Sequence, residues 1–210
     1  MKRVLAVDDH AVVRDGVKTL FDHQPGMVSV GEASTAEEAI RLVTTQDWDL
    51  VVLDLSLGGR SGLDVLKQVR QLRPKLPVLI LSAHSEQQYA RRAFQAGASG
   101  YITKDCPRTE LLKAIRKVMD GGRYLSADLA EALTLDLERG SNKEPHEALS
   151  DREFEVMKLI ASGKTVGEIA ELLTLSDKTV STYRARILEK MHFKTNAEMT
   201  RYAFQRKLVE

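Results

Sequence analysis

The sequence has very few cysteines and almost no net charge, and each shortage excludes a class of protein. Cys106 is its one cysteine, so no disulfide can form within the chain, and a lone thiol suits a reducing compartment. The formal charge over 210 residues is only +1, so the chain has no overall basic charge to attract nucleic acid. Any surface that binds nucleic acid must therefore be local.

Long apolar runs are missing as well. No segment approaches the roughly twenty apolar residues that a membrane helix needs. Met1-Lys2-Arg3 leads directly into a short strand-like run, without the apolar core of a signal peptide. We therefore expect a cytoplasmic protein with no membrane partner.

The first part of the chain alternates short apolar runs with longer helical patterns. This alternation is typical of βα units around a parallel sheet. Helix starts are indicated by a capping box at Ser34-Thr35-Ala36-Glu37 and by Pro107 in a first turn. The predicted strands are Val4 to Asp8, Val28 to Ala33, Leu50 to Asp54, Val78 to Ser82 and Gly100 to Ile102. The pattern predicts an α/β domain with a doubly wound, five-stranded parallel sheet over residues 1–120.

The second part of the chain carries signals for short helices only. Between the two parts, residues 121–148 are predicted to be a linker with one short helix from Ser126 to about Leu137. From residue 149 to 210, helix starts are predicted at Ser150, Thr165, Ser176 and Thr195. Ile169, Leu172 and Leu173 give the second of these helices an apolar face. The tight Thr174-Leu175 turn then makes this all-α, four-helix domain resemble a helix-turn-helix unit.

Two predicted strands end in carboxylates, which is the most informative feature of the chain. Asp8 and Asp9 follow one apolar run, and Asp54 follows another. In a doubly wound sheet, ligands bind beyond the carboxyl ends of the strands, so these side chains should meet at one edge. Crowded carboxylates repel one another and favour a hard divalent cation such as Mg²⁺, beside which one of them can attack phosphorus.

With these motifs in place, nearly the whole chain resembles a two-component response regulator of the NarL/FixJ subfamily. Such a regulator has a CheY-like, flavodoxin-like receiver and a LuxR-type DNA-binding domain. The receiver residues that carry the resemblance are Asp8-Asp9, Asp54, Gly62, Ser82-Ala83, Tyr101 and Lys104. The DNA-binding residues that carry it are Leu149 to Glu153, Glu168-Ile169-Ala170 and Ser176 to Val180.

The resemblance implies a role for each receiver residue. Asp54 would accept a phosphoryl group from a sensor histidine kinase, and Lys104 and Ser82 would contact that group. The shift of Ser82 would let Tyr101 rotate inward and so change a surface of the domain. The expected ligands of Mg²⁺ are Asp8, Asp9, Asp54 and the backbone carbonyl of Ser56.

The helix that begins after Ser176 is predicted to contact double-stranded DNA. Val180, Ile187, Leu188 and Met191 share its apolar face. The opposite face presents Lys178, Ser181, Thr182, Ala185 and Arg186 to a major groove. Arg184 falls within the apolar stripe, and we expect it to reach a phosphate or an acidic neighbour.

One such small domain would bind DNA weakly, which favours a homodimer in the phosphorylated state. Met199, Tyr202 and Ala203 of the last helix are the predicted interface. RNA polymerase is a further candidate partner. The function predicted from the sequence is thus a transcriptional regulator, not an enzyme, that binds specific DNA sequences under the control of phosphorylation.

Three alternative functions can be considered for this chain. A Mg²⁺-dependent phosphohydrolase of the haloacid dehalogenase type needs a carboxylate two residues after its nucleophile, where this chain has Ser56. A flavin carrier needs a phosphate loop after the first strand, where Asp8 and Asp9 would repel the phosphate. The last domain could also be a helical dimerisation module. Against this reading, basic residues outnumber acidic ones on the helix after Ser176.

Overall fold

The computed structural model describes residues 1–21, 28–57, 60–83, 87–126, 129–131 and 144–209. The chain divides into two compact units, Met1–Arg139 and Gly140–Glu210. Most of the predicted linker helix, from Ser126 to about Leu137, lies outside the described residues. Within the described residues, no helix combines the length and the apolar character needed to cross a bilayer.

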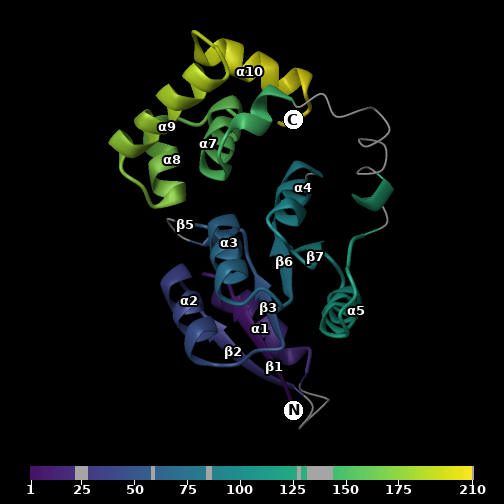
Figure 1. The fold of residues 1–210 in the computed structure, drawn as a ribbon. Helices are drawn as coiled ribbons and strands as arrows, with labels where there is room; N and C mark the ends of the chain where they lie inside the picture. The colour runs from purple at the N-terminus through teal and green to yellow at the C-terminus, as the bar shows by residue number, and fades with distance from the viewer. Residues whose placement is uncertain (22–27, 58–59, 84–86, 127–128, 132–143, 210) are drawn as a thin grey trace. The chain divides into compact units, whose positions relative to one another are not determined.

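The first unit contains a five-stranded parallel sheet with the order β2-β1-β3-β6-β7 (Figure 1), which confirms the prediction. Its strands are β1 (Lys2–Val7), β2 (Val28–Ala33), β3 (Leu50–Leu53), β6 (Val78–Ser82) and β7 (Gly100–Thr103). All four residues of β3 are buried, as expected for a central strand that is covered on both faces. Because β3 lies at the centre of the sheet, its carboxyl end is surrounded by the ends of its neighbours.

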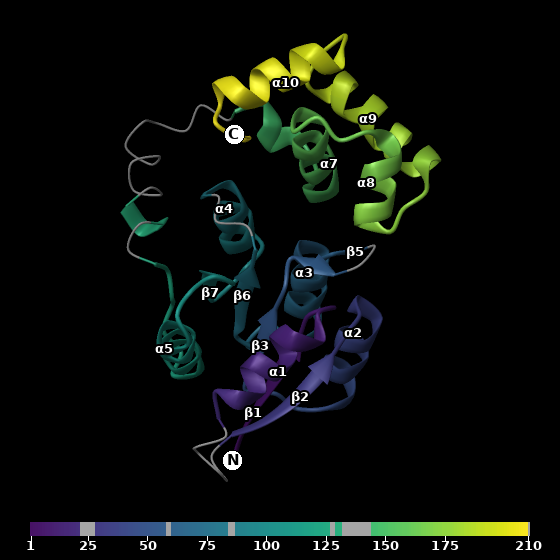
Figure 2. The same ribbon diagram turned by 180° about the vertical axis from the view of Figure 1, so that it is seen from behind.

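Helices cover both faces of this sheet (Figures 1 and 2). They are α1 (Ala11–Thr19), α2 (Ala36–Thr45), α3 (Gly62–Leu72), α4 (Gln87–Gln95) and α5 (Arg108–Met119). Val17 of α1 and Ile115 of α5 join one core cluster with Val4 of β1 and Val52 of β3. Helices α2 and α3 contact each other, and α3 also contacts α4. This two-sided burial fixes where each strand ends.

The start of α2 differs by one residue from the prediction. Thr35, not Ser34, is the N-cap, and its hydroxyl accepts a hydrogen bond from the backbone N–H of Glu38. The Glu38 carboxylate accepts from the backbone N–H of Ser34 in return. The sequence offers acidic residues at both 37 and 38, so the pattern alone could not choose the register.

A small antiparallel sheet, which the sequence did not predict, follows β3. It consists of β4 (Ser56–Leu57) and β5 (Arg60–Ser61), and it leads into α3 at Gly62. The backbone N–H of Gly62 donates to the carbonyl of Leu55 at 2.7 Å. A Cβ on Gly62 would lie 2.6 Å from the Cα of Leu55 and would also clash with the carbonyl oxygen of Asp54. Only glycine therefore allows α3 to start this close to the end of β3.

The second unit consists of helices: η1 (Pro145–Ala148), α7 (Asp151–Ala161), α8 (Val166–Leu173), α9 (Asp177–Lys190) and α10 (Asn196–Gln205). Ser150 and Thr165 form reciprocal capping boxes with Glu153 and Glu168, as predicted. The hydroxyls of Ser176 and Thr195 also cap their helices. Four side-chain caps satisfy backbone N–H groups that would otherwise lack partners, which is why such short helices have defined starts.

The turn between α8 and α9 depends on a residue in the left-handed conformation. Thr174 has φ 53°, and the backbone N–H of Leu175 donates to the carbonyl of Ala170 at 2.8 Å. This turn forms as predicted, but the apolar face of α8 is narrower than expected. Ile169 and Leu173 are buried, whereas Leu172 is 58% exposed.

We predict that Gly62→Ala destabilises the first unit. The added methyl group must push main-chain atoms of Asp54 and Leu55, and overpacking of this kind costs about 1 to 3 kcal/mol. Trp48, the one tryptophan of the chain, lies in the first unit, so its fluorescence during urea unfolding would report the change.

Gly16→Ala is the matched control. Nothing lies within 4 Å of a Cβ at Gly16 in α1, so the free energy of unfolding should rise by about 0.5 to 1 kcal/mol. Equal stability of the Gly62→Ala variant and the wild type would contradict the close approach.

Candidate functional site

The candidate site lies where β1 and β3 end, because backbone hydrogen bonds align the two strands to their last residues. The backbone N–H of Asp54 donates to the carbonyl of Val7 at 2.9 Å, and that of Asp8 donates to the carbonyl of Ala33 at 3.1 Å. The first residues after the two central strands are therefore neighbours. The sheet brings together Asp8 and Asp54 as the sequence predicted.

Lys104 connects the two carboxylates. Its ammonium group donates to Oδ2 of Asp54 at 2.7 Å and lies 2.8 Å from Oδ2 of Asp8. Both carboxylates are buried; Asp54 is only 2% exposed. Lys104 follows β7, and its backbone N–H donates to the carbonyl of Ser82 at the end of β6, which fixes the lysine at this edge of the sheet.

An acidic cluster surrounds this pair. Asp8, Asp9, His10 and Asp54 offer ligand atoms that all lie within 4.8 Å of one another. Oδ1 of Asp54 is buried and has no hydrogen-bond partner of good geometry among the described residues. Three carboxylates against one ammonium leave negative charge that a divalent cation would balance, so these residues fit Mg²⁺. The sequence analysis missed His10, although it directly follows Asp8 and Asp9.

Burial and charge set the ionisation of the site. Burial raises the pKa of Asp54 from 3.8 to about 6, although the hydrogen bond from Lys104 acts in the opposite direction. Burial alone would lower the pKa of Lys104, but its hydrogen bonds to Asp54 and Asp8 outweigh this effect and raise the pKa. Near neutral pH the site therefore holds a carboxylate at Asp54 and an ammonium at Lys104.

The other predicted receiver residues lie near this edge with different exposures. Ser82 ends β6 and is fully buried. Ser56 lies in β4, and its backbone hydrogen bond to Asp54 lowers the pKa of that carboxyl group, against the effect of burial. The side chain of Tyr101 on β7 is buried, at 0% exposure.

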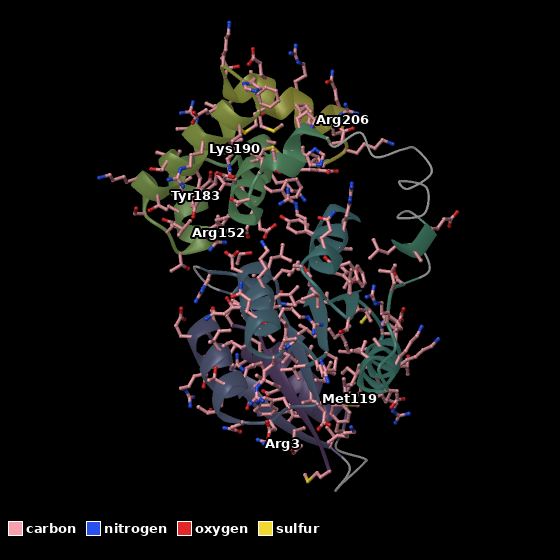
Figure 3. All side chains as sticks on the ribbon, in the orientation of Figure 1. Arg3, Met119, Arg152, Tyr183, Lys190 and Arg206 are labelled. Atoms are coloured by element: carbon pink, nitrogen blue, oxygen red, sulfur yellow. The ribbon has the colours of Figure 1, made fainter. Side chains whose placement is uncertain are left out.

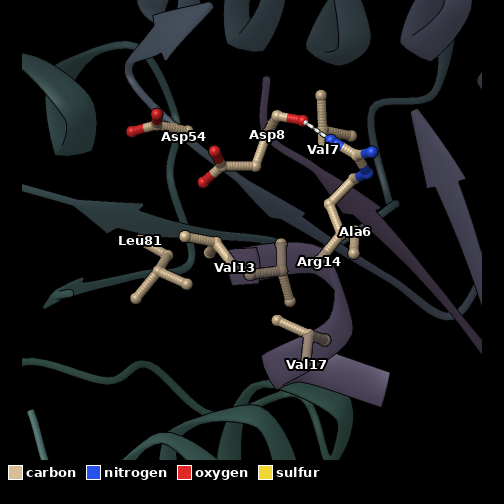
Figure 4. Close-up of a pocket in the computed structure, with 9 residues that line it drawn as sticks. Ala6, Val7, Asp8, Val13, Arg14, Val17, Asp54 and Leu81 are labelled. Carbon is tan, nitrogen blue, oxygen red and sulfur yellow. Dashed lines mark hydrogen bonds between the residues drawn. The ribbon is translucent and has the colours of Figure 1, made fainter. Parts of the chain in front are cut away.

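Arg14 is a second residue that the sequence analysis missed. Figure 4 shows its guanidinium reaching back from α1 to the carbonyl oxygen of Asp8, at 2.7 Å. Below the carboxylates in this view, the apolar side chains of Val13, Val17 and Leu81 close the bottom of the site. The buried carboxylates of Asp8 and Asp54 thus lie next to an apolar surface.

In the second unit, α9 has the two faces that the sequence predicted. Val180 and Ile187 are fully buried and Met191 is almost so, whereas Leu188 is only half-buried. The exposed residues of the opposite face are Lys178, Ser181, Thr182, Ala185 and Arg186. The hydroxyl of Thr182 donates to the carbonyl of Lys178 at 2.9 Å, so its oxygen still has a free lone pair to accept a hydrogen bond.

Two basic residues of α9 have partners inside the unit. Nε of Arg184 donates to Oδ1 of Asn196 at 2.7 Å, which joins α9 to the start of α10. This bond uses only Nε of Arg184, so the expectation that Arg184 reaches a phosphate stays a prediction. Lys190, labelled in Figure 3, donates to the buried Glu153 of α7 at 2.6 Å. These two hydrogen bonds join α9 to α10 and to α7.

The predicted dimer residues on α10 are also corrected. Met199 and Ala203 are 0% exposed and belong to the core of the second unit, because this face of α10 packs on α7. Tyr202 is half-buried, and its hydroxyl forms a 2.8 Å hydrogen bond with Nδ1 of His146. The exposed face of α10 instead carries Arg201 and Phe204, the latter 51% exposed.

Two protein families match the two units. The family described as the response regulator receiver domain matches residues 4–116. The family of bacterial regulatory proteins described as the luxR family matches residues 147–203. Together the two matches cover the sheet, its site and the helical unit.

Similar proteins cover the full length of the chain. Response regulator UvrY of Escherichia coli (strain K12) is 35% identical over 206 residues, which span 98% of this chain and 94% of that protein. Response regulator GacA of Pseudomonas aeruginosa is 34% identical and covers 100% of this chain and 99% of its own. The crystal structure of a LuxR-family two-component response regulator from Aurantimonas sp. SI85-9A1 has a TM-score of 0.60 and 38% identity. It covers 64% of this chain and 96% of its own.

We predict that Asp54→Asn changes the pH dependence of stability in metal-free protein. The pKa of Asp54 lies above its ordinary value, so its contribution to stability is complete below about pH 3.8 and is lost as the pH rises through about 6. A shift of about two pKa units corresponds to about 3 kcal/mol at about 1.4 kcal/mol per unit. Asparagine keeps the shape and carries no charge, so this loss should disappear in the variant.

Urea unfolding followed by Trp48 fluorescence in the presence of a chelator would measure the effect between pH 4 and pH 7.5. The stability of Asp54→Asn relative to wild type should increase over this range. Asp15→Asn is the control, because Asp15 lies on α1 with a side chain that is 70% exposed. A constant difference between Asp54→Asn and wild type across the range would show that Asp54 ionises normally.

Proposed function

Since this chain belongs to the NarL/FixJ subfamily of two-component response regulators, with a receiver domain followed by a LuxR-type DNA-binding domain, we propose that Asp54 is its phosphorylation site. Proteins of this family are phosphorylation-dependent transcription regulators and not enzymes. The observation that carries the assignment is the buried Asp54 carboxylate, paired with Lys104 beside two further aspartates. The proposed donor is the phosphohistidine of a sensor histidine kinase.

The chain's own residues support a direct transfer. A carboxylate oxygen of Asp54 attacks phosphorus, the new O–P bond forms, and the P–N bond to the donor imidazole breaks. Because the pKa of Asp54 is about 6, its carboxylate is mostly ionised at neutral pH and can act as the nucleophile. Lys104, which is already at hydrogen-bond distance, offsets the charge of the transferred group.

The proposed ligands of Mg²⁺ are the side chains of Asp8, Asp9 and Asp54 together with the backbone carbonyl of Ser56. The crowding of these carboxylates and the unpartnered Oδ1 of Asp54 support this set. When bound, Mg²⁺ supplies positive charge to the oxygens of the phosphoryl group. The carboxylates then no longer repel the incoming anion.

Ser82 is the proposed sensor of the modification. It ends β6 next to β3, and the backbone of Lys104 is hydrogen-bonded to its carbonyl, so it lies at the same edge of the sheet as the proposed phosphorylation site. Its hydroxyl would bind a phosphoryl oxygen and move the loop that leads to α4. Tyr101 is the proposed second part of this switch, and its buried side chain on β7 matches the inward position that the switch requires.

The exposed face of α9 is the proposed recognition surface for double-stranded DNA. Lys178 and Arg186 suit phosphates, whereas Ser181, Thr182 and Ala185 suit base edges. The turn at Thr174 and the caps of α8 and α9 fix this face relative to the core of the domain. A regulator that binds chromosomal DNA would act in the cytoplasm, where RNA polymerase is a further proposed partner.

A homodimer of the phosphorylated protein is proposed because two copies double the DNA contacts. The buried residues of α10 cannot serve as the interface, but its exposed face can. Phe204 and Arg201 lie one turn apart on that face, so an aromatic side chain and a positively charged one are available to a second copy.

We predict that acetyl phosphate with Mg²⁺ adds the mass of one phosphoryl group to the wild type and not to Asp54→Asn. Asparagine has no nucleophilic oxygen of comparable reactivity, so the modification should be lost. Intact-protein mass spectrometry measures this directly. The same mass gain in the asparagine variant would show that another residue is modified.

Ser82→Ala separates modification from response in the same experiment. This variant should accept the phosphoryl group but should lack the phosphorylation-dependent gain in dimerisation and DNA affinity. That gain is expected to correspond to about 1 to 3 kcal/mol of coupling in the wild type. Full gain in the alanine variant would exclude Ser82 as the sensor.

We predict that substitutions on α9 divide into two kinds. Thr182→Ala should reduce discrimination between matched and mismatched operators, because Thr182 is placed to contact bases. Lys178→Ala should weaken binding to all DNA and reduce the slope of log affinity against log salt by about one unit, through the loss of one phosphate contact.

Binding isotherms over a salt series, on operators selected from random DNA, would measure both effects. Lys207→Ala is the control, because it removes the same charge from an exposed position after α10. Unchanged discrimination in Thr182→Ala together with altered discrimination in Lys178→Ala would mean that α9 lies differently in the groove.

A further inference from the structure

The turn between β1 and α1 holds two of the three clustered aspartates, and it leads into α1 without a side-chain cap. His10 is the N-cap of α1 and makes no side-chain capping hydrogen bond, unlike the caps of α2, α7, α8, α9 and α10. The backbone N–H of His10 donates to Oδ1 of Asp8 at 2.8 Å. This bond lies within the turn and does not attach it to the rest of the domain.

Asp8, at the start of the turn, is held by its backbone N–H to the carbonyl of Ala33 and by its carboxylate to Lys104. Arg14 adds an attachment that spans the turn from the side of α1. Its Nη1 donates to the backbone carbonyl of Asp8 at 2.7 Å, and its Nε donates to the carboxylate of Glu32 at 3.2 Å (Figure 4 shows the first bond). Glu32 lies near the end of β2, the strand next to β1. One guanidinium therefore joins α1, the end of β1 and the end of β2.

The charge of Arg14 is balanced away from the cluster. Glu32 binds both Lys18 and Arg14, and these hydrogen bonds, with that from Lys18 the stronger, lower the pKa of Glu32. Toward the turn, Arg14 contacts a carbonyl oxygen and not a carboxylate. Its contribution to the cluster is therefore the position of the turn and not neutralisation of its carboxylates.

We propose that Arg14 is a positioning residue for the divalent cation: it holds the turn so that Asp8 and Asp9 present their carboxylates to Asp54. This inference rests on the proposed function, in which these carboxylates bind Mg²⁺. Without the attachment, repulsion among the carboxylates would open the turn, and the cation would lose preorganised ligands. Residues that orient the ligands of a metal commonly change its affinity by about 10-fold to 100-fold when they are replaced.

The two physical roles that a nearby arginine can have predict opposite effects. If Arg14 acted only through its charge, Arg14→Gln would remove repulsion toward the cation and tighten Mg²⁺ binding. If Arg14 positions the turn, the same change weakens Mg²⁺ binding, by about 10-fold. Arg14→Lys keeps the charge but cannot bridge Asp8 and Glu32 with a planar group, so a smaller loss is expected.

The test is calorimetric titration of the full-length, unphosphorylated protein with MgCl₂ at constant ionic strength. Lys18→Gln is the matched control, because Lys18 also binds Glu32 but has no contact with the carbonyl of Asp8. We expect wild-type affinity in Lys18→Gln, a roughly 10-fold loss in Arg14→Gln and an intermediate loss in Arg14→Lys. Phosphorylation by acetyl phosphate should need correspondingly more Mg²⁺ in the Arg14 variants but should approach the wild-type rate at saturation.

Each other outcome has a definite meaning. Equal or tighter Mg²⁺ binding by Arg14→Gln overturns the inference while leaving the proposed function intact. Absence of Mg²⁺ binding by the wild type overturns the proposed metal site itself. If circular dichroism shows that Arg14→Gln is unfolded, Arg14→Lys decides, and wild-type affinity in that variant overturns the inference.

Discussion

The contact of Lys104 with the two buried carboxylates is the interaction on which the receiver site depends. Asp8 and Asp54 lie at the ends of adjacent strands, and burial raises the pKa of Asp54. Nζ of Lys104 lies 2.7 Å from Oδ2 of Asp54 and 2.8 Å from Oδ2 of Asp8, and its hydrogen bond to Asp54 acts against the effect of burial on the pKa of that carboxyl group. The site remains short of positive charge, and this shortage is what prepares it for a divalent cation and a phosphoryl group.

The sheet creates this contact through its register. Asp54 and Lys104 are far apart in sequence, and Asp8 comes from a third strand, yet all three follow strands of one parallel sheet. Glycine at position 62 lets α3 start against the main chain of Asp54 and Leu55, and Arg14 ties the turn after β1 to β2. The backbone around the carboxylates is thus held by the sheet, by the start of α3 and by Arg14.

The DNA-binding unit obeys a different constraint. Its helices are short, so their positions depend on side-chain caps and on a small core shared by α7, α8, α9 and α10. Met199 and Ala203 of α10, whose spacing also suited a dimer interface, are buried in this core. Arg184 of α9 is hydrogen-bonded to Asn196 at the start of α10. What remains exposed on α9 and α10 is the surface available to DNA and to a second copy.

The sequence by itself determined the five strands of the parallel sheet, all four Ser and Thr caps in the second unit, and the carboxylates that follow β1 and β3. These features are local, because strand periodicity, caps and strand ends are written in neighbouring residues. Only the tertiary structure decided that Tyr101 and Met199 are buried, that Leu172 is exposed, and that Arg14 reaches the carbonyl of Asp8. Burial depends on which face of an element another element covers, and a hydrogen bond from a side chain to a distant main-chain oxygen leaves no periodic signal in the sequence.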